Sequence, residues 1–279
     1  MKRITQIIRD ELGSYHPTGE VTALTRIIAT ELLGFSQTAF YLKDDVTLTA
    51  DQERLLCNAI ERLKKQEPIQ YILGYSDFCG LRFKVTTATL IPRPETSELV
   101  EWVANEATGK ESILDIGTGS GCIAVSLAHK MPQCDVTAWD ISPEALAIAT
   151  ENSKANGCAV TFEKVDILTQ QPTSKQFGII VSNPPYIKEN EKEAMHSNVL
   201  DWEPHTALFV PDNDPLLFYR TIAKKGLELL FPGGKLYFEI NRAHGNDTIE
   251  MLKSLGYTSI ELRKDFAEND RMIRAIKKQ

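Results

Sequence analysis

The feature that most constrains the fold is an alternation of short β-rich runs with helical stretches after Pro94. The strands expected from it are Ser112–Leu114, Val136–Trp139, Val160–Val165, Gly178–Val181, Leu236–Ile240, Ser259–Leu262 and Met272–Ile276. The helices expected between them are Ser97–Thr108, Cys122–Lys130, Pro143–Asn156, Pro215–Leu230 and Asp247–Leu255. Strands that alternate with helices form a parallel sheet covered on both faces. We therefore predict a doubly wound α/β domain over residues 93–279.

The first quarter of the chain has helical rather than strand periodicity. Apolar residues lie at the spacing of one helix face around Ile4, between Thr22 and Gly34, and again from Leu55 to Leu63. Asp51 is the expected N-cap of the last of these helices, which should stop near Pro68. The pattern predicts a small helical domain over residues 1–73 with the apolar stripes in its core.

A change of period separates the two predicted domains. Tyr71–Gly74 and Leu81–Val85 alternate apolar and polar residues around a turn, as paired strands do. We interpret residues 74–92 as a β-hairpin that links the helical domain to the α/β domain.

Composition narrows the possible partners and compartments. No apolar run is long enough for a membrane span, and the N-terminus lacks the features of a signal peptide. The five cysteines have no C-x-x-C spacing, which predicts reduced thiols in the cytoplasm and no metal site. Cys122 fits a packing residue better than a nucleophile. A net charge of −7 argues against binding of free nucleic acid. We expect a cytoplasmic monomer with no membrane partner.

A glycine-rich loop between the first predicted strand of the α/β domain and the next helix is the candidate cofactor site. Its candidate binding residues are Asp115, Gly117, Thr118, Gly119, Ser120 and Gly121. Such loops lie at the carboxyl ends of strands, where open α/β sheets bind ligands. The loop also fits the dinucleotide pattern G-x-G-x-x-[GA], which is weak alone. Asp140, at the end of the second strand, could bind the ribose hydroxyls of a dinucleotide or of another nucleoside cofactor.

The carboxylate of Asp115 favours S-adenosyl-L-methionine over a dinucleotide as the cofactor. A negative charge directly before the loop disfavours a pyrophosphate and suits S-adenosyl-L-methionine, which carries an ammonium and a sulfonium but no phosphate. The arrangement D-x-G-x-G-x-G resembles motif I of the class I methyltransferases. Asp166 and Ile167, after the third strand, would lie beside the adenine by the same topology. A turn residue and a core residue are equally good interpretations of these two.

The fourth strand ends in Asn183-Pro184-Pro185-Tyr186. The two prolines have no N–H and restrict the backbone, so the loop is rigid and offers mainly acceptors. The Asn183 side-chain oxygen and the Pro184 carbonyl match the two hydrogens of a planar –NH₂ group. The Tyr186 ring offers a flat face for stacking. We interpret these four residues as the catalytic site and Asn183 also as a candidate cofactor contact; a proline-rich surface turn is the plain alternative.

Together the two loops resemble those of methyltransferases that modify planar nitrogen. Further segments are similar to the PrmC/HemK family of peptide chain release factor glutamine methyltransferases, and they are Pro68–Gly74, Ile91–Thr96, Asp140–Pro143, Glu203–His205 and Asp270–Arg271. The resemblance covers essentially the whole chain. It departs from the family at Asn241 and His244, where a glycine and a glutamine are usual, and at Ile167, where some members have an aromatic residue. We interpret His244 as an incidental loop histidine without an acid partner.

This resemblance implies a fold and a reaction. The fold is a class I (Rossmann-like) methyltransferase sheet with a small helical N-terminal domain joined by a β-hairpin. The reaction is methylation of the glutamine in the GGQ loop of class 1 release factors, with the helical domain contacting the release factor. Asn183 and Pro184 would hold the glutamine amide, with Pro185 and Tyr186 as the pocket wall. Arg93 and Glu95 either shape the mouth of the site or form salt bridges that anchor the hairpin.

Three other functions share some of these features. An adenine-N6 DNA methyltransferase would use the same acceptor loop, but it needs a basic region to hold and flip the base. The enzyme that methylates a glutamine of a ribosomal protein is closely related. A catalytically inactive cofactor sensor is the third alternative, although a sensor has no use for an amide-binding loop.

Overall fold

The computed structural model describes residues 1–42, 46–170 and 175–279. The chain forms two compact units. The smaller unit consists of Met1–Gly74 and His196–Trp202, and the larger consists of Tyr75–Met195 and Glu203–Gln279. The chain therefore passes between the units three times, because a short segment from the second half of the sequence belongs to the first unit.

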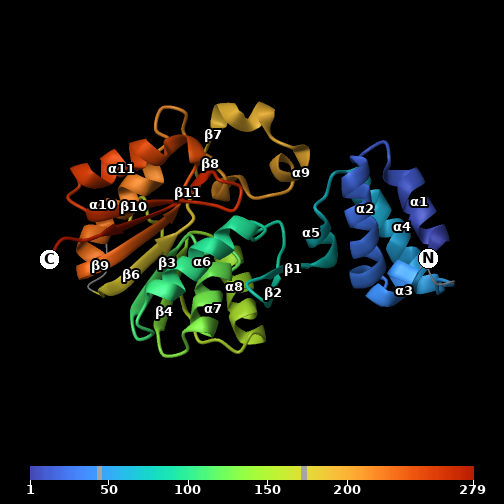
Figure 1. Cartoon of the computed structure of the whole chain (residues 1–279), viewed down its shortest axis with the longest axis horizontal. Helices are drawn as coiled ribbons and strands as arrows, with labels where there is room; N and C mark the ends of the chain where they lie inside the picture. Colours follow the sequence, from blue (N-terminus) through green and yellow to red (C-terminus); the bar gives the residue numbers. More distant parts are fainter. Residues whose placement is uncertain (43–45, 171–174) are drawn as a thin grey trace. The chain divides into compact units, whose positions relative to one another are not determined.

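The smaller unit is a bundle of short helices (Figure 1). Its elements are α1 (Lys2–Leu12), α2 (Thr18–Ile27), the π-helical turn η1 (Ile28–Leu32), α3 (Gln37–Leu42), α4 (Ala50–Lys64), α5 (Ile69–Leu73) and α9 (Ser197–Leu200). Ile4, Ile8 and Leu12 of α1 are buried, four residues apart on one face. They share a core with Leu24 and Leu63. Apolar stripes at helical spacing thus form this core, as predicted.

Two details of α4 differ from the prediction. Asp51 is not the N-cap, because Thr49 holds that position in a capping box. The Thr49 hydroxyl accepts a hydrogen bond from the Gln52 N–H at 3.2 Å, and the Gln52 side chain accepts one from the Thr49 N–H at 3.0 Å. Leu55, predicted to belong to the apolar stripe, is 42% exposed.

The strand predicted at Tyr71–Gly74 is wrong. The segment forms the one-turn helix α5, which begins after Pro68 and ends at Gly74, where φ is +81°. The Gly74 N–H closes the helix by donating to the Gln70 carbonyl at 2.8 Å. A proline before the helix and a left-handed glycine after it favour this turn over a strand, despite the β-branched Ile72.

The predicted hairpin begins after α5 and belongs to the larger unit. It pairs β1 (Tyr75–Phe78) with β2 (Leu81–Lys84) in antiparallel register. Phe78 and Phe83 pack edge to face, with ring centroids 6.0 Å apart. The Asn152 side chain accepts from the Lys84 N–H at 2.7 Å and donates to the Lys84 carbonyl at 3.0 Å. The buried Asn152 amide therefore pairs with the backbone of Lys84 as a residue of a neighbouring strand would.

The larger unit is built on a seven-stranded sheet with the order β10-β11-β9-β6-β3-β4-β5. Its strands are β3 (Ser112–Ile116), β4 (Asp135–Asp140), β5 (Thr161–Lys164), β6 (Phe177–Ser182), β9 (Leu230–Glu239), β10 (Thr258–Lys264) and β11 (Asp270–Ile276). All seven predicted strands are confirmed. The expectation of a wholly parallel sheet is wrong, because β11 runs antiparallel to both β9 and β10. The short turn between β10 and β11 leaves no room for a crossover helix, so the strand returns directly.

Helices cover both faces of this sheet (Figure 1). They are α6 (Pro94–Glu106), α7 (Cys122–Lys130), α8 (Pro143–Ala155), α10 (Leu217–Leu229) and α11 (Gly245–Ser254). Ile113 of β3 lies in the core with α6 and α7, whereas its neighbour Leu114 lies in the core with α10 and α11. Successive residues of a strand point to opposite faces of the sheet. Because both faces here are covered by helices, the strands are apolar at consecutive positions.

A long excursion after β6 was not predicted. It contains β7 (Ile187–Lys188), the 3₁₀ turns η2 (Glu189–Ala194) and η3 (His205–Ala207), and β8 (Phe209–Val210), besides α9. β7 and β8 pair in parallel and bring both ends of the excursion together. Within the described ranges, none of the helices combines the length and apolar character that a bilayer crossing requires.

Replacing Asn152 by alanine is expected to destabilise the larger unit by about 2–4 kcal/mol, because the partly buried backbone groups of Lys84 and the buried carbonyl of Ser120 lose their partner. The measurement is the midpoint and slope of urea unfolding. Asn156→Ala is the matched control on the same helix end, since its bond to the Arg82 carbonyl is exposed. Equal destabilisation by both substitutions would contradict the anchoring role of Asn152.

Candidate active site

A cavity of about 340 Å³ lies at the carboxyl ends of the parallel strands. This volume is in the range of small-ligand pockets in proteins. The strand ends contribute Ile116, Gly117, Gly119, Asp140, Ile141, Ser142, Val165, Asp166, Ile167, Leu168, Ser182, Asn183, Pro184 and Pro185. The remaining walls are Ala88, Thr89, Leu90, Ala145, Pro204, Thr206, Ala207, Phe209, Phe218 and Ile222. The two predicted loops thus meet at one cavity with two of the three predicted acidic residues, Asp140 and Asp166.

The glycine loop lies along the cavity with its backbone held from behind. Gly117 and Thr118 donate their N–H groups to the Trp139 carbonyl, at 2.9 and 3.0 Å. Gly117 and Gly119 line the cavity and have φ of +75° and +56°. These values are in the left-handed region, and the loop therefore needs glycine to expose its backbone to a ligand.

Not every residue of the predicted loop reaches the cavity. Thr118, Ser120 and Gly121 do not line it. The Thr118 hydroxyl donates instead to Asp115 at 2.6 Å. A Cβ on Gly121 would lie 3.0 Å from the Cβ of Ala149. The last glycine therefore allows α7 and α8 to pack closely behind the loop.

Asp115 is fully buried under the loop and does not line the cavity. Its Oδ2 accepts from the Thr118 hydroxyl and, at 3.2 Å, from the Ala124 N–H at the start of α7. Its Oδ1 is buried and has no partner among the described residues. Burial raises the pKa of Asp115 to about 7. One carboxylate oxygen thus shapes the loop, and the other keeps an unused acceptor.

Asp140 lines the cavity at the end of β4. Its Oδ2 accepts from the Gly119 N–H at 2.8 Å, and its Oδ1 accepts from the Ser142 N–H at 2.9 Å. Burial raises the pKa of this carboxyl group above its ordinary value. Each carboxylate oxygen has a second lone pair, so Asp140 can fix the glycine loop and still accept from a ligand.

Asp166 and Ile167 also line the cavity. Asp166 caps its own turn, accepting from the Leu168 N–H at 2.9 Å and from the Thr169 hydroxyl at 2.7 Å. The bond from Thr169 lowers the pKa of Asp166. Asp166 is therefore both a turn residue and part of the cavity wall, and Ile167 is partly buried against the core behind it.

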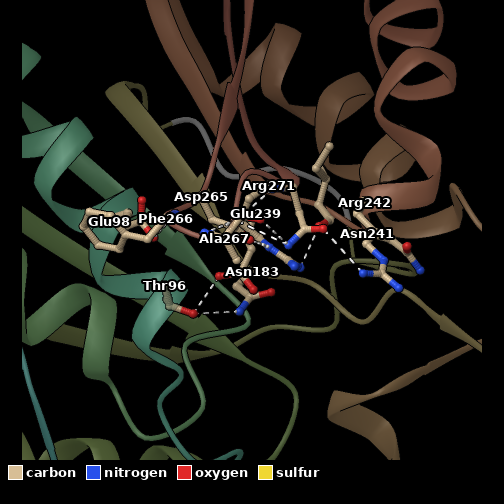
Figure 2. A network of polar contacts seen from close by, with 12 residues as sticks. Thr96, Glu98, Asn183, Glu239, Asn241, Arg242, Asp265, Phe266, Ala267 and Arg271 are labelled. Carbon is tan, nitrogen blue, oxygen red and sulfur yellow. Dashed lines mark hydrogen bonds and ion pairs between the residues drawn. The ribbon is translucent and has the colours of Figure 1, made fainter.

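The Asn183–Tyr186 loop divides between two hollows. Asn183, Pro184 and Pro185 line the main cavity, whereas Tyr186 lines a neighbouring hollow of about 330 Å³. The Asn183 Nδ2 donates to the Thr96 hydroxyl at 3.3 Å (Figure 2), and the Oδ1 accepts from no donor among the residues that the structure describes. The Tyr186 hydroxyl donates to Glu239 at 3.4 Å, and burial raises its pKa.

Sequence reasoning missed the residues that support this loop. Thr96 and Glu239 lie within or beside segments that resemble the family, yet nothing in the spacing showed that they approach Asn183. Asn241, which replaces the usual glycine, donates to the Tyr186 carbonyl at 3.2 Å. His244 does have an acid partner, Asp247 at 3.0 Å, which corrects the prediction, and it does not line the cavity.

Two further predictions concern single residues. Arg93 forms an ion pair with Glu203 at 2.5 Å, and the Glu203 side chain is only 1% exposed. This pair joins the segment before α6 to the segment that carries Pro204 of the cavity wall. Arg93 therefore supports the wall of the site. Burial raises the pKa of Cys122 to about 12, which disfavours a thiolate nucleophile and fits a packing residue.

Two family models and several relatives match the chain. Methyltransferase small domain matches residues 95–201, and PrmC N-terminal domain matches residues 10–74. The release factor glutamine methyltransferase of Bacteroides thetaiotaomicron is 51% identical over 99% of both chains. That of Flavobacterium psychrophilum is 44% identical, over 97% of this chain and 96% of its own.

A solved structure gives the same fold. A methyltransferase from Pyrococcus furiosus superposes with a TM-score of 0.54 at 19% identity, covering 83% of this chain and 100% of its own. The α/β sheet, the glycine loop and the matched domain define an S-adenosylmethionine-dependent methyltransferase. Within that class, the chain belongs to the release factor glutamine methyltransferase family.

Asp115→Asn is expected to gain stability relative to wild type as the pH rises. The folded chain keeps a proton on Asp115 between the ordinary pKa of 3.8 and about 7, while the unfolded chain releases it. Wild-type stability therefore falls across this window, by about 1.4 kcal/mol for each unit of pH, and the amide variant does not show this fall because its side chain does not titrate. Urea unfolding from pH 4 to pH 8 measures the difference. A difference that does not change with pH would contradict the raised pKa.

Proposed function

We propose that this chain transfers a methyl group from S-adenosyl-L-methionine to the side-chain amide nitrogen (N5) of the glutamine in the GGQ motif of class 1 peptide chain release factors. The observation that carries the proposal is the Asn183 carboxamide, anchored through Nδ2 so that its Oδ1 remains an acceptor at the cavity. The names of relatives up to 51% identical supply the substrate class. The reaction would modulate translation termination in the cytoplasm.

The residues around the cavity fit the cofactor. Asp140 has spare lone pairs for the ribose hydroxyls, and Gly117 and Gly119 offer exposed backbone. Asp115 lies behind the loop with its Oδ1 unpartnered among the described residues, and we propose that a nearby ammonium group of the cofactor would favour its ionised form. Asp166 and Ile167 are proposed to lie beside the adenine. When bound, the cofactor supplies a methyl group activated by a positively charged sulfur.

The substrate nitrogen is a weak nucleophile because its lone pair is delocalised into the amide. We infer that Asn183 Oδ1 and the Pro184 carbonyl each accept one of its two hydrogens, which fixes the plane of the group. Alignment of this kind can supply several kcal/mol of the barrier. The nitrogen becomes acidic once it is alkylated, so the mechanism does not require a strong base. Pro185 and Tyr186 would complete the wall beside the amide.

The organisation of the chain is consistent with a protein substrate. The helical unit at Met1–Gly74 matches the PrmC N-terminal domain and is not enriched in basic charge as a base-flipping region would be. We propose that this unit, predicted as residues 1–73, contacts the release factor and helps to present its loop to the methyltransferase domain.

The direct test incubates the protein with methyl-labelled S-adenosylmethionine and purified class 1 release factors. Mass spectrometry of the GGQ peptide is expected to show one added methyl on the glutamine. In the same assay Asn183→Ala should reduce kcat by about 10²–10³-fold, because one amide hydrogen loses its acceptor, while cofactor affinity stays within about twofold.

Controls separate the possible failures of this test. A release factor whose GGQ glutamine is replaced by alanine should remain unlabelled. Labelling of a ribosomal protein or of DNA in place of the release factor would overturn the substrate assignment. Cofactor binding without turnover on any of these substrates would indicate a sensor.

Asp140→Ala is expected to weaken cofactor binding by roughly 10- to 100-fold, the range for loss of hydrogen bonds to a charged group. Titration calorimetry with S-adenosylmethionine measures the change. Asp135→Ala is the matched control, because Asp135 lies at the exposed start of the same strand. Wild-type affinity in Asp140→Ala would exclude the ribose contact.

A further inference from the structure

Behind the Asn183 side chain lies a short chain of two hydrogen bonds, the first partly buried and the second buried (Figure 2). The Asn183 Nδ2 donates to the Thr96 Oγ1 at 3.3 Å, and the Thr96 Oγ1 donates to the Glu239 Oε2 at 2.6 Å. Thr96 and Glu239 are each 2% or less exposed. Three elements meet here, since Thr96 lies in the first turn of α6, Asn183 follows β6, and Glu239 ends β9.

The donors and acceptors in this chain have only one consistent direction while Glu239 is ionised. A carboxylate can only accept, so the Thr96 hydroxyl must give its single hydrogen to Glu239. Its remaining lone pairs can then only accept, and of the two ends of the Asn183 carboxamide only Nδ2 can donate. The Oδ1 is thereby turned away from Thr96. The charge on Glu239 thus determines the orientation of an amide two hydrogen bonds away.

The other oxygen of Glu239 serves the far end of the same loop. Its Oε1 accepts from the Tyr186 hydroxyl at 3.4 Å. Two residues further along, Asn241 donates to the Tyr186 carbonyl. The end of β9 therefore holds the Asn183–Tyr186 loop at both of its ends, directly at Tyr186 and through Thr96 at Asn183.

Glu239 has the features of an orienting group rather than of an ion-pair partner. In the part of the chain that the structure describes, it forms no ion pair, and the nearby Arg271 is paired with Asp265 at 2.9 Å. Burial raises the pKa of Glu239, and the bond from Thr96 is the first of the interactions that oppose this rise. A buried carboxylate without an ion pair is costly for stability. Glu239 accepts two hydrogen bonds, one from Tyr186 of the loop and one from Thr96, which supports the loop.

We propose that Thr96 and Glu239 are positioning residues for methyl transfer, which hold the Asn183 carboxamide with Oδ1 towards the substrate amide and Nδ2 away from it. This inference rests on the proposed function, because it assigns a role to Asn183 in binding the glutamine. A flipped carboxamide would present its two hydrogens to the two hydrogens of the substrate amide and could not accept a hydrogen bond from it.

Thr96→Val tests the inference, since valine has nearly the same shape and lacks the hydroxyl. It is expected to lower kcat about tenfold or more, with cofactor affinity and KM for the release factor changed less than about threefold. Thr96→Ser keeps the hydroxyl and should restore most of the activity. Ser97→Ala is the matched control, because the exposed Ser97 hydroxyl donates to the Pro94 carbonyl in the same helical turn.

A double-mutant cycle separates orientation from general support. In the Asn183→Ala background, Thr96→Val should have little further effect on kcat, because there is no carboxamide left to orient. Glu239→Leu, which removes the acceptor that fixes the direction of the Thr96 hydroxyl, should resemble Thr96→Val. Unfolding midpoints of the variants check that each is folded, and Glu239→Leu and Thr96→Ser keep the test decisive if the valine variant is not.

Each outcome has a distinct meaning. Wild-type kcat in Thr96→Val would overturn the positioning role while leaving the proposed function intact. If Thr96→Val lowers kcat equally in the wild-type and Asn183→Ala backgrounds, Thr96 does not act through Asn183, and the positioning role is also overturned. Absence of glutamine methylation by the wild-type protein would instead refute the proposed function.

Discussion

The site depends on one constraint, which is that β3, β4, β5 and β6 are parallel and end at the same edge of the sheet. Four loops far apart in sequence must therefore meet there. The backbone groups at these ends are not paired within the sheet and are either satisfied by side chains or offered to a ligand. Asp140 shows both, because its carboxylate fixes the Gly119 N–H and still faces the cavity.

Three buried carboxylates hold the loops around the site in place. Asp115 holds the turn of the glycine loop, Glu203 pairs with Arg93 across the cavity wall, and Glu239 supports the Asn183–Tyr186 loop. Burial raises the pKa of all three carboxyl groups, which means that keeping each one ionised in the folded chain costs stability. Because an ionised carboxylate can only accept, each one also determines which way its neighbours must point their hydrogens. Such groups specify orientation more than they add stability.

Much of the fold could be predicted because its signals are local. The seven strands and five helices of the α/β domain follow from apolar runs and from glycine and proline at their ends. The errors arose where a local signal was ambiguous or absent. Tyr71–Leu73 is short and contains a β-branched residue, and the proline before the turn and the left-handed glycine after it outweigh that preference for a strand. The direction of β11 depends on pairing with β9 and β10, which no periodicity reports.

The residue pattern alone predicts the class of fold, the glycine loop, Asp140 and the acceptor-rich Asn183–Tyr186 loop, because each depends on the intrinsic properties of residues a few positions apart. The prolines restrict their own backbone, and the glycines can adopt left-handed conformations without steric cost. Only the tertiary structure decided which loop residues reach the cavity, that Tyr186 lines a different hollow, and that Thr96 and Glu239 stand behind Asn183. The physical reason is that hydrogen bonds act over about 3 Å, and residues 87 and 143 positions apart come that close only after the sheet has formed.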